Sequence, residues 1–358
     1  MLKRKPRTAL EKGAVLLAVL GVGAALLLGA QITTTYWHAA NSPALRTDLV
    51  WDEDREPPAA QAVETAEAQL NESVHYHKAK ALIESGAPPE EVHQYLEGGI
   101  NTLMEQKQFK LAAKLLSFAA QYAIKVNGEQ SIQPVSLQKN LVECLWRARD
   151  YAGAAQASQT LLRITAFMGP DDRAPFALQM ANAYYMQSKW NDAAEAYATY
   201  FQLHFKHRSG KPESQESRHS ADVAMAVSRM ATCHRHLADK AQKSELFSEA
   251  TKYRKSSARE FTEAYERWKL IKGETTGNTV VALVNSLHER HLLDKSENLD
   301  DQYSQAIHDT ESQFGDNSAY YAVALMNYSD YLLDKGNLFG GMSARLNSWK
   351  ILSSQKIS

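Results

Sequence analysis

The stretch from Ala174 to Phe205 constrains the fold most, because two amphipathic helical patterns follow each other directly in it. Apolar residues recur at three- and four-residue steps in each half, as one face of an α-helix requires. The polar residues Gln187 to Lys189 separate the two halves. A single helical hairpin of this size cannot bury its apolar face alone, so similar units must stack on both sides of it. The sequence therefore predicts an all-α fold built as an α-solenoid.

The spacing of small and aromatic residues in this hairpin resembles the tetratricopeptide repeat (TPR). In such a repeat the small residues let two helices approach closely, and large rings fill the space that remains. The residues that carry the resemblance are Ala181, Tyr184, Trp190, Ala193 and Tyr197, and Ser188 stands where the family has a glycine. The resemblance implies helix pairs whose first helices line a protein-binding groove.

Aromatic–alanine pairs at the starts of other second helices repeat the pattern. Phe109 with Ala112 and Tyr151 with Ala154 precede Trp190 with Ala193. The family pattern is matched over residues 89–205 and again over 312–353, where Gly341 replaces the small residue of the second helix. A Phe-Gly-Asp turn and a recurring asparagine (Asn140, Asn285, Asn327) resemble the kinesin-light-chain-type subgroup. We expect five to six helix pairs over residues 89–353.

In the middle of the chain, over residues 217–311, the family pattern is weak, and helix pairs are expected there only because repeats lie on both sides. Helices are expected at 217–239, 243–268, 277–294 and 297–313, after a polar insertion loop at 206–216. Before the repeats, residues 59–88 form an expected N-terminal capping helix, and residues 33–58 form a flexible tether that is acidic around Asp52–Glu56.

The N-terminus predicts a membrane anchor. Residues 13–32 are long and apolar enough for one transmembrane helix, and the basic segment 1–12 precedes them. By the positive-inside rule the N-terminus stays in the cytoplasm and the solenoid is exported, in a bacterium to the periplasm. A cleaved signal peptide is the alternative, although the small residues that cleavage requires are poorly placed. Gly21, Ala25 and Gly29 form a small-residue stripe that could pack two anchors together as a homodimer, or reflect the ordinary composition of membrane spans.

Composition and motifs disfavour several other functions. The formal net charge is −1, which gives nucleic-acid binding no electrostatic support. Cys144 and Cys233 lie 89 positions apart (233 − 144), and both are expected to be buried, unpaired thiols. No phosphate-binding loop, nucleophile motif or dinucleotide fingerprint occurs, so we expect neither a cofactor nor catalysis.

An alternative function of another class is a metal-binding protein or an enzyme that uses pairs of histidines. His204 with His207, and His288 with His291, have a spacing that could touch one metal ion, but no third ligand is evident. Surface histidines explain both pairs more simply, so the sequence predicts no metal site.

The family resemblance also assigns candidate groove residues on the first helices. These are Asn101, Lys139, Glu143, Trp146, Arg147, Leu178, Asn182 and Tyr185. Tryptophan and arginine are plausible anchors for a bound peptide, while packing of Trp146 and Tyr185 into neighbouring helices is the competing interpretation. The expected function is a membrane-anchored scaffold or adaptor for a protein partner in assembly of a membrane or secretion complex. A periplasmic chaperone-like subunit that receives exported proteins is the alternative.

Overall fold

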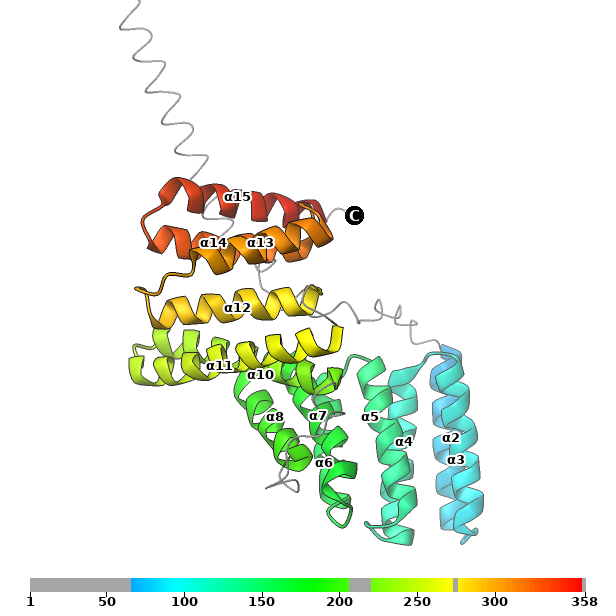
Figure 1. Ribbon diagram of the computed structural model, residues 1–358. Helices are drawn as coiled ribbons and strands as arrows, with labels where there is room; N and C mark the ends of the chain where they lie inside the picture. The colour runs from blue at the N-terminus through cyan, green and yellow to red at the C-terminus, as the bar shows by residue number, and fades with distance from the viewer. Residues whose placement is uncertain (1–65, 206–219, 273–275, 356–358) are drawn as a thin grey trace, which may run out of the picture. The chain divides into compact units, whose positions relative to one another are not determined.

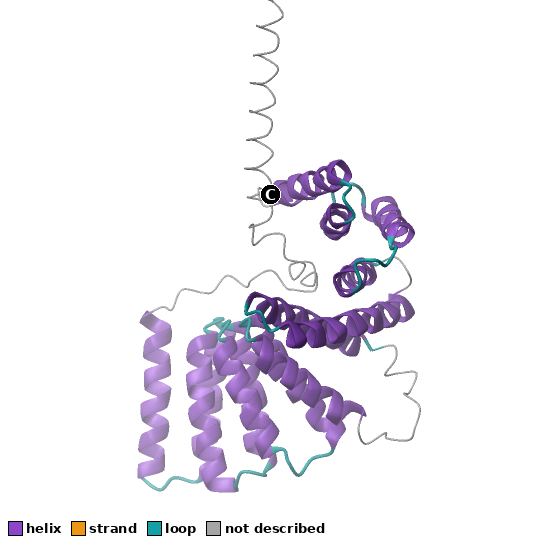
Figure 2. Cartoon of the chain, turned by 90° about the vertical axis from the view of Figure 1, so that its left-hand side faces the viewer, coloured by secondary structure: helices purple, strands orange, loops and turns teal. Residues whose placement is uncertain are grey.

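The computed structural model describes residues 66–205, 220–272 and 276–355, which form thirteen α-helices and no strand (Figures 1 and 2). They divide between two compact units, an N-terminal unit that ends at Glu274 and a C-terminal unit that begins at Thr275. The all-α prediction is confirmed for these residues. The predicted anchor, tether and insertion loop lie outside them, and no helix within them is long and apolar enough to cross a membrane.

The N-terminal unit contains nine helices, which pack as successive neighbours (Figure 1). They are α2 (Ala66–Glu84), α3 (Pro89–Glu105), α4 (Phe109–Asn127), α5 (Ile132–Arg147), α6 (Tyr151–Ile164), α7 (Pro170–Met186), α8 (Trp190–Phe205), α10 (Ala221–Lys243) and α11 (Phe247–Lys272). After α2, they form four pairs, each made of a first and a second helix. The predicted capping helix corresponds to α2, whose Tyr76 packs edge-on against Phe118 of α4 at 4.9 Å between ring centroids.

The C-terminal unit contains two further pairs. Its helices are α12 (Gly277–Leu293), α13 (Asp300–Phe314), α14 (Ala319–Asp334) and α15 (Leu338–Gln355). The described residues therefore hold six pairs, at the upper end of the predicted number.

One turn geometry ends the first helix of five of the six pairs. At Lys107, Arg149, Ser188 and Glu245 the backbone takes φ values of 57° to 59°, and at Gly336 it takes 81°. At Ser188, the Lys189 N–H donates to the Tyr184 carbonyl and the Ser188 N–H to the Tyr185 carbonyl. These two bonds define a Schellman motif, which satisfies carbonyls at the helix end and reverses the chain.

This turn explains the glycine that the family resemblance implies at Ser188. The position requires the left-handed region, which costs a residue with a side chain roughly 1–2 kcal/mol and costs glycine almost nothing. Four of the five turns accept that cost, and only Gly336 avoids it.

A second turn, from a second helix into the next first helix, recurs in both units. Gly128 after α4 and Gly315 after α13 have φ values of 83° and 81°, and their ψ values are 155° and 162°. In each turn the glycine N–H donates to the residue four positions earlier, and its carbonyl accepts from Ser131 or Ser318. The shared Gly-x-x-Ser geometry supports the repeat relation that the Phe-Gly-Asp pattern predicts.

Small residues let the paired helices approach. Ala181 of α7 and Ala193 of α8 are completely buried, as is Tyr197, which fills the space beside them. In the last pair Gly341 has this role, since a Cβ atom there would lie 2.6 Å from Leu333 Cγ and 3.1 Å from the Ser329 carbonyl oxygen. The packing that the sequence predicts at these positions is confirmed.

Helices α10 and α11 are the longest pair, and both begin about four residues later than the sequence suggests. Ser220 caps α10 by accepting a hydrogen bond from the Val223 N–H at 3.4 Å, which fixes the start. Polar contacts join the pair: the Trp268 indole donates to Ser228 Oγ at 3.2 Å in the interior, and Arg254 donates to the partly exposed Asp239 at 2.8 Å. Cys233 of α10 and Cys144 of α5 are both buried, as predicted.

We expect Ser188→Gly to raise the free energy of unfolding by about 0.5–1 kcal/mol, because glycine adopts the left-handed turn without strain. Urea unfolding followed by circular dichroism measures this change. Gly336→Ser is the matched control and should destabilise by about 1 kcal/mol. Space around Gly336 is open, so backbone strain alone produces that loss. Equal effects of one sign from both variants would contradict this account of the turn.

Candidate protein-binding surface

The predicted groove residues divide into an exposed group and a packed group. Asn101 of α3 and the four predicted residues of α5 are exposed. Leu178 and Asn182 of α7 are half-buried, and Tyr185 is only 8% exposed.

On α5, four exposed side chains form a mixed aromatic and charged surface, called the α5 surface below. The Glu143 carboxylate accepts from the Arg147 guanidinium at 2.7 Å, and Arg147 also lies over the Phe109 ring at 5.4 Å. Lys139 Nζ lies 5.1 Å from the centroid of a further ring, that of Phe176 on α7. These contacts orient the two cations while leaving them accessible to solvent.

Trp146 completes the α5 surface. Its ring meets Tyr151 of α6 edge-on at 5.1 Å between centroids, and 37% of the residue remains exposed. The ring of Trp146 therefore packs against a neighbouring helix and also remains partly exposed to solvent. A ring held in this way can bury more apolar area against a partner without losing much conformational freedom.

On α7, Asn182 belongs to a polar cluster inside the N-terminal unit. Its Oδ1 accepts from the Tyr197 hydroxyl at 2.7 Å and from Arg229 Nη1 of α10 at 2.9 Å. Arg229 also lies over the ring of Tyr185 at 5.5 Å. Burial raises the pKa of Tyr197, so its hydroxyl stays a donor. Asn182 and Tyr185 therefore connect α7 to α8 and α10, which favours the packing interpretation for this pair.

The sequence pattern did not predict that α10 contributes to this polar cluster. Arg229 follows Asn182 by 47 positions and lies where the repeat pattern weakens. His236 of α10 stacks on Trp190 of α8 at 4.1 Å with an 11° angle between rings. The sequence does contain an indication of these contacts, because Arg229 and His236 interrupt an alanine-rich helical pattern.

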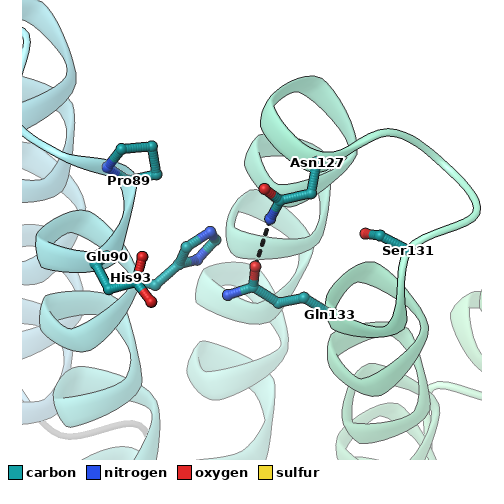
Figure 3. Close-up of a pocket in the computed structure, with 6 residues that line it drawn as sticks. All are labelled: Pro89, Glu90, His93, Asn127, Ser131 and Gln133. Atoms are coloured by element: carbon teal, nitrogen blue, oxygen red, sulfur yellow. Dashed lines mark hydrogen bonds between the residues drawn. The ribbon is translucent and has the colours of Figure 1, made fainter.

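A polar pocket of about 420 Å³ lies where α3, α4 and α5 have adjacent ends (Figure 3). The His93 ring lies beside Glu90, and the Asn127 amide donates to Gln133 across the pocket. Among the described residues, neither His93 Nε2 nor Ser131 Oγ has a hydrogen-bond partner, although both atoms are buried. Burial lowers the pKa of His93 despite the opposing charge of Glu90, so the imidazole is neutral at pH 7.

The histidine pairs do not assemble a metal site within the described residues. No group of three His, Cys, Asp or Glu side chains there could hold an ion. His291 is fully buried and its Nε2 lies 3.0 Å from Asp334, whereas His207 lies outside the described residues.

Solved structures similar to this chain include the two described next, while no family model and no curated protein matches it. BtubC (BKLC) from P. vanneervenii is 13% identical over 69% of this chain and 92% of its own, with a TM-score of 0.46. A signal transduction ATPase with numerous domains and a tetratricopeptide repeat sensor, from Pyrococcus horikoshii, is 12% identical over 92% of this chain and 48% of its own, with a TM-score of 0.47. The description of this chain as TPR-like helix pairs rests on its own turns and packing.

Replacing Asn182 by leucine should cost about 2–3 kcal/mol of unfolding free energy, because Tyr197 and Arg229 lose their shared acceptor. Gln179→Leu, on an exposed position of the same helix, should change stability by less than about 0.5 kcal/mol. The double variant Asn182→Leu with Tyr197→Phe should lose less unfolding free energy than the sum of the losses in the two single variants. Strictly additive losses would show that the cluster is not coupled.

We expect acidification below pH 6.5 to destabilise the N-terminal unit through His93. The folded state keeps this imidazole neutral, whereas the unfolded chain takes up a proton at the ordinary pKa of 6.5. Stability is therefore lost as the pH falls below 6.5. Thermal unfolding should show a smaller decrease between pH 7 and pH 5.5 for His93→Gln than for the unchanged chain. An unchanged pH dependence in this variant would contradict the assignment.

Proposed function

We propose that this chain is a non-catalytic, membrane-anchored scaffold that binds a protein partner through the α5 surface. The observation that carries the proposal is the exposure of Trp146 beside three exposed charged residues on one helix, Lys139, Glu143 and Arg147. Tryptophan and arginine are the residues that most often dominate binding energy at protein interfaces. A helix surface that mixes an aromatic ring with paired charges suits an extended or helical peptide.

The packed residues of α7 support this surface without forming part of it. Asn182 and Tyr185 hold α7 against α10 through Arg229. Lys139 in turn lies over Phe176 of α7. The α5 surface is thus presented by a rigid neighbour, which lowers the entropy lost on binding.

The membrane part of the proposal rests on the sequence. The apolar residues 13–32 follow the basic segment 1–12, which favours a single-pass anchor with the N-terminus in the cytoplasm. The helix pairs would then face the periplasm of a bacterium, and the anchor would concentrate any bound partner at the membrane. Assembly of a membrane or secretion complex is a task of this kind.

We expect the double variant Trp146→Ala with Arg147→Ala to reduce recovery of the partner at least tenfold, because truncating two interface anchors typically costs more than about 1.4 kcal/mol. The measurement is cross-linking of the full-length protein in its native membrane, followed by purification and quantitative mass spectrometry.

Phe339→Ala is the matched control, since Phe339 is a 94% exposed aromatic residue of the C-terminal unit. It should leave partner recovery unchanged. A partner retained equally by all three proteins would contradict binding at the α5 surface. Recovery of many unrelated exported proteins, all lost in the double variant, would instead indicate a chaperone-like subunit.

A further inference from the structure

An open groove runs along the second-helix side of the N-terminal unit, between α4 and α6. It encloses about 740 Å³, and α5 forms its floor. We call it the α4–α6 groove. Its lining residues extend on α4 from Lys110 to Ile124, about 21 Å at the rise of an α-helix.

Several of the side chains on the walls of the groove are small, which leaves space between α4 and α6. Ala113, Ser117 and Ala120 face it from α4, and Gly153 and Ala157 face it from α6. None of these side chains is large enough to fill the space between two helices. The walls therefore leave apolar surface accessible along the middle of the groove.

The floor is apolar and its one buried amide is satisfied. Gln138 Nε2 donates to the Ala157 carbonyl at 3.1 Å, and Leu141 and Leu145 form the rest of the floor. Gly153 keeps the wall low, since a Cβ atom there would lie 2.6 Å from Asp150 Oδ2 and 3.0 Å from Leu145 Cδ2, so these side chains would have to move. An occupant of the groove must bring apolar side chains to this floor.

One end of the groove carries an excess of positive charge. Lys110 and Lys114 are exposed there, and neither forms an ion pair with a carboxylate among the described residues. Asp150 at the same end already accepts from the Gly153 N–H at 2.9 Å, as the cap of α6. At the other end Arg163 is paired with Glu129. An occupant with acidic residues at the lysine end would match this charge pattern.

The chain itself contains a segment with this pattern. Residues 48–56 read Asp-Leu-Val-Trp-Asp-Glu-Asp-Arg-Glu, with five acidic residues and one arginine, a net charge of −4. Three apolar residues, Leu49 to Trp51, directly precede the densest acidic part. The segment therefore has an apolar part followed by an acidic part. The groove likewise has an apolar floor and, at one end, two lysines.

The segment also lies close enough along the chain. Helices α2 and α4 run in the same direction, because each is joined to α3 by a short turn, and the Tyr76–Phe118 contact places them side by side. The chain thus enters α2 at the lysine end of α4. Residues 57–65 can span up to about 30 Å, which exceeds the width of one helix. Entry from this end brings the acidic part to the lysines first and the apolar part to the floor beyond.

We propose that residues 48–56 bind in the α4–α6 groove of the same chain. Asp52, Glu53 and Asp54 pair with Lys110 and Lys114, and the Leu49–Trp51 part covers the apolar floor. A covalently linked segment has an effective concentration in the millimolar range, so even weak contacts keep it bound. The segment before α2 is then attached to the second-helix side of the unit, on the opposite face of α5 from the α5 surface.

Thiol labelling of the full-length protein in detergent tests this proposal. Gln121→Cys introduces an exposed thiol in the groove, and the native cysteines are buried, with the pKa of Cys144 raised to about 11. We expect neutralisation by Asp52→Asn, Glu53→Gln and Asp54→Asn to accelerate maleimide labelling of the introduced thiol about tenfold. Ser136→Cys, on an exposed position of α5 away from the groove, is the control whose rate should not change.

A charge exchange makes the test independent of folding defects. Lys110→Glu with Lys114→Glu should also accelerate labelling, and adding Asp52→Lys, Glu53→Lys and Asp54→Lys should restore protection. Equal labelling rates in all these proteins would overturn the proposal.

Disulfide formation in the variant Trp51→Cys with Gln121→Cys identifies the chain that supplies the segment. A cross-link within one chain supports the proposal, whereas a cross-link only between two chains overturns it in favour of exchange between copies.

Discussion

The left-handed residue that ends the first helix in five of the six pairs is the constraint on which these pairs depend. It completes a Schellman motif, so the chain reverses within three residues and the second helix begins directly against the first. Lys107, Arg149, Ser188 and Glu245 adopt this conformation despite their side chains. The tertiary packing of each pair must therefore exceed the local backbone cost, and it does so where alanines and large rings interlock.

Stacking of the pairs produces two surfaces of different character. First helices such as α5 present long charged side chains and an exposed ring, and contacts such as Lys139 over Phe176 hold these in place. Second helices such as α4 and α6 carry small residues that pack well inside a pair but leave space between neighbouring pairs. Small residues thus account for close pairing, as at Ala181 and Ala193, and for the groove on the second-helix side, as at Ala113 and Ala157.

The sequence predicts well what local pattern determines. The small residues Ala181 and Ala193 and the ring of Tyr197 occupy the buried positions that their spacing indicates. Contacts between distant repeats are harder to predict, because a family pattern assigns a facing direction but not a neighbour. Asn182, a predicted groove residue, accepts a hydrogen bond from Arg229, and no motif predicts this contact because Arg229 lies where the repeat pattern is weak.

Empty space is the least predictable feature. The α4–α6 groove exists because several side chains are small at once, and the same composition would be expected of a well-packed helix. Likewise, His93 and Ser131 line one pocket because the ends of α3, α4 and α5 are adjacent, and no sequence motif indicates this arrangement. The charge of an exposed helix such as α5 could be predicted, whereas its pairing with particular rings could not.

Site-specific photo-cross-linking in living cells shows which protein contacts the α5 surface. We expect a photoreactive phenylalanine analogue in place of Trp146 to give one dominant cross-linked protein partner, and the same analogue in place of Phe339 not to capture that partner. A dominant partner captured only from position 339 would contradict a scaffold that binds through the first helices of the N-terminal unit.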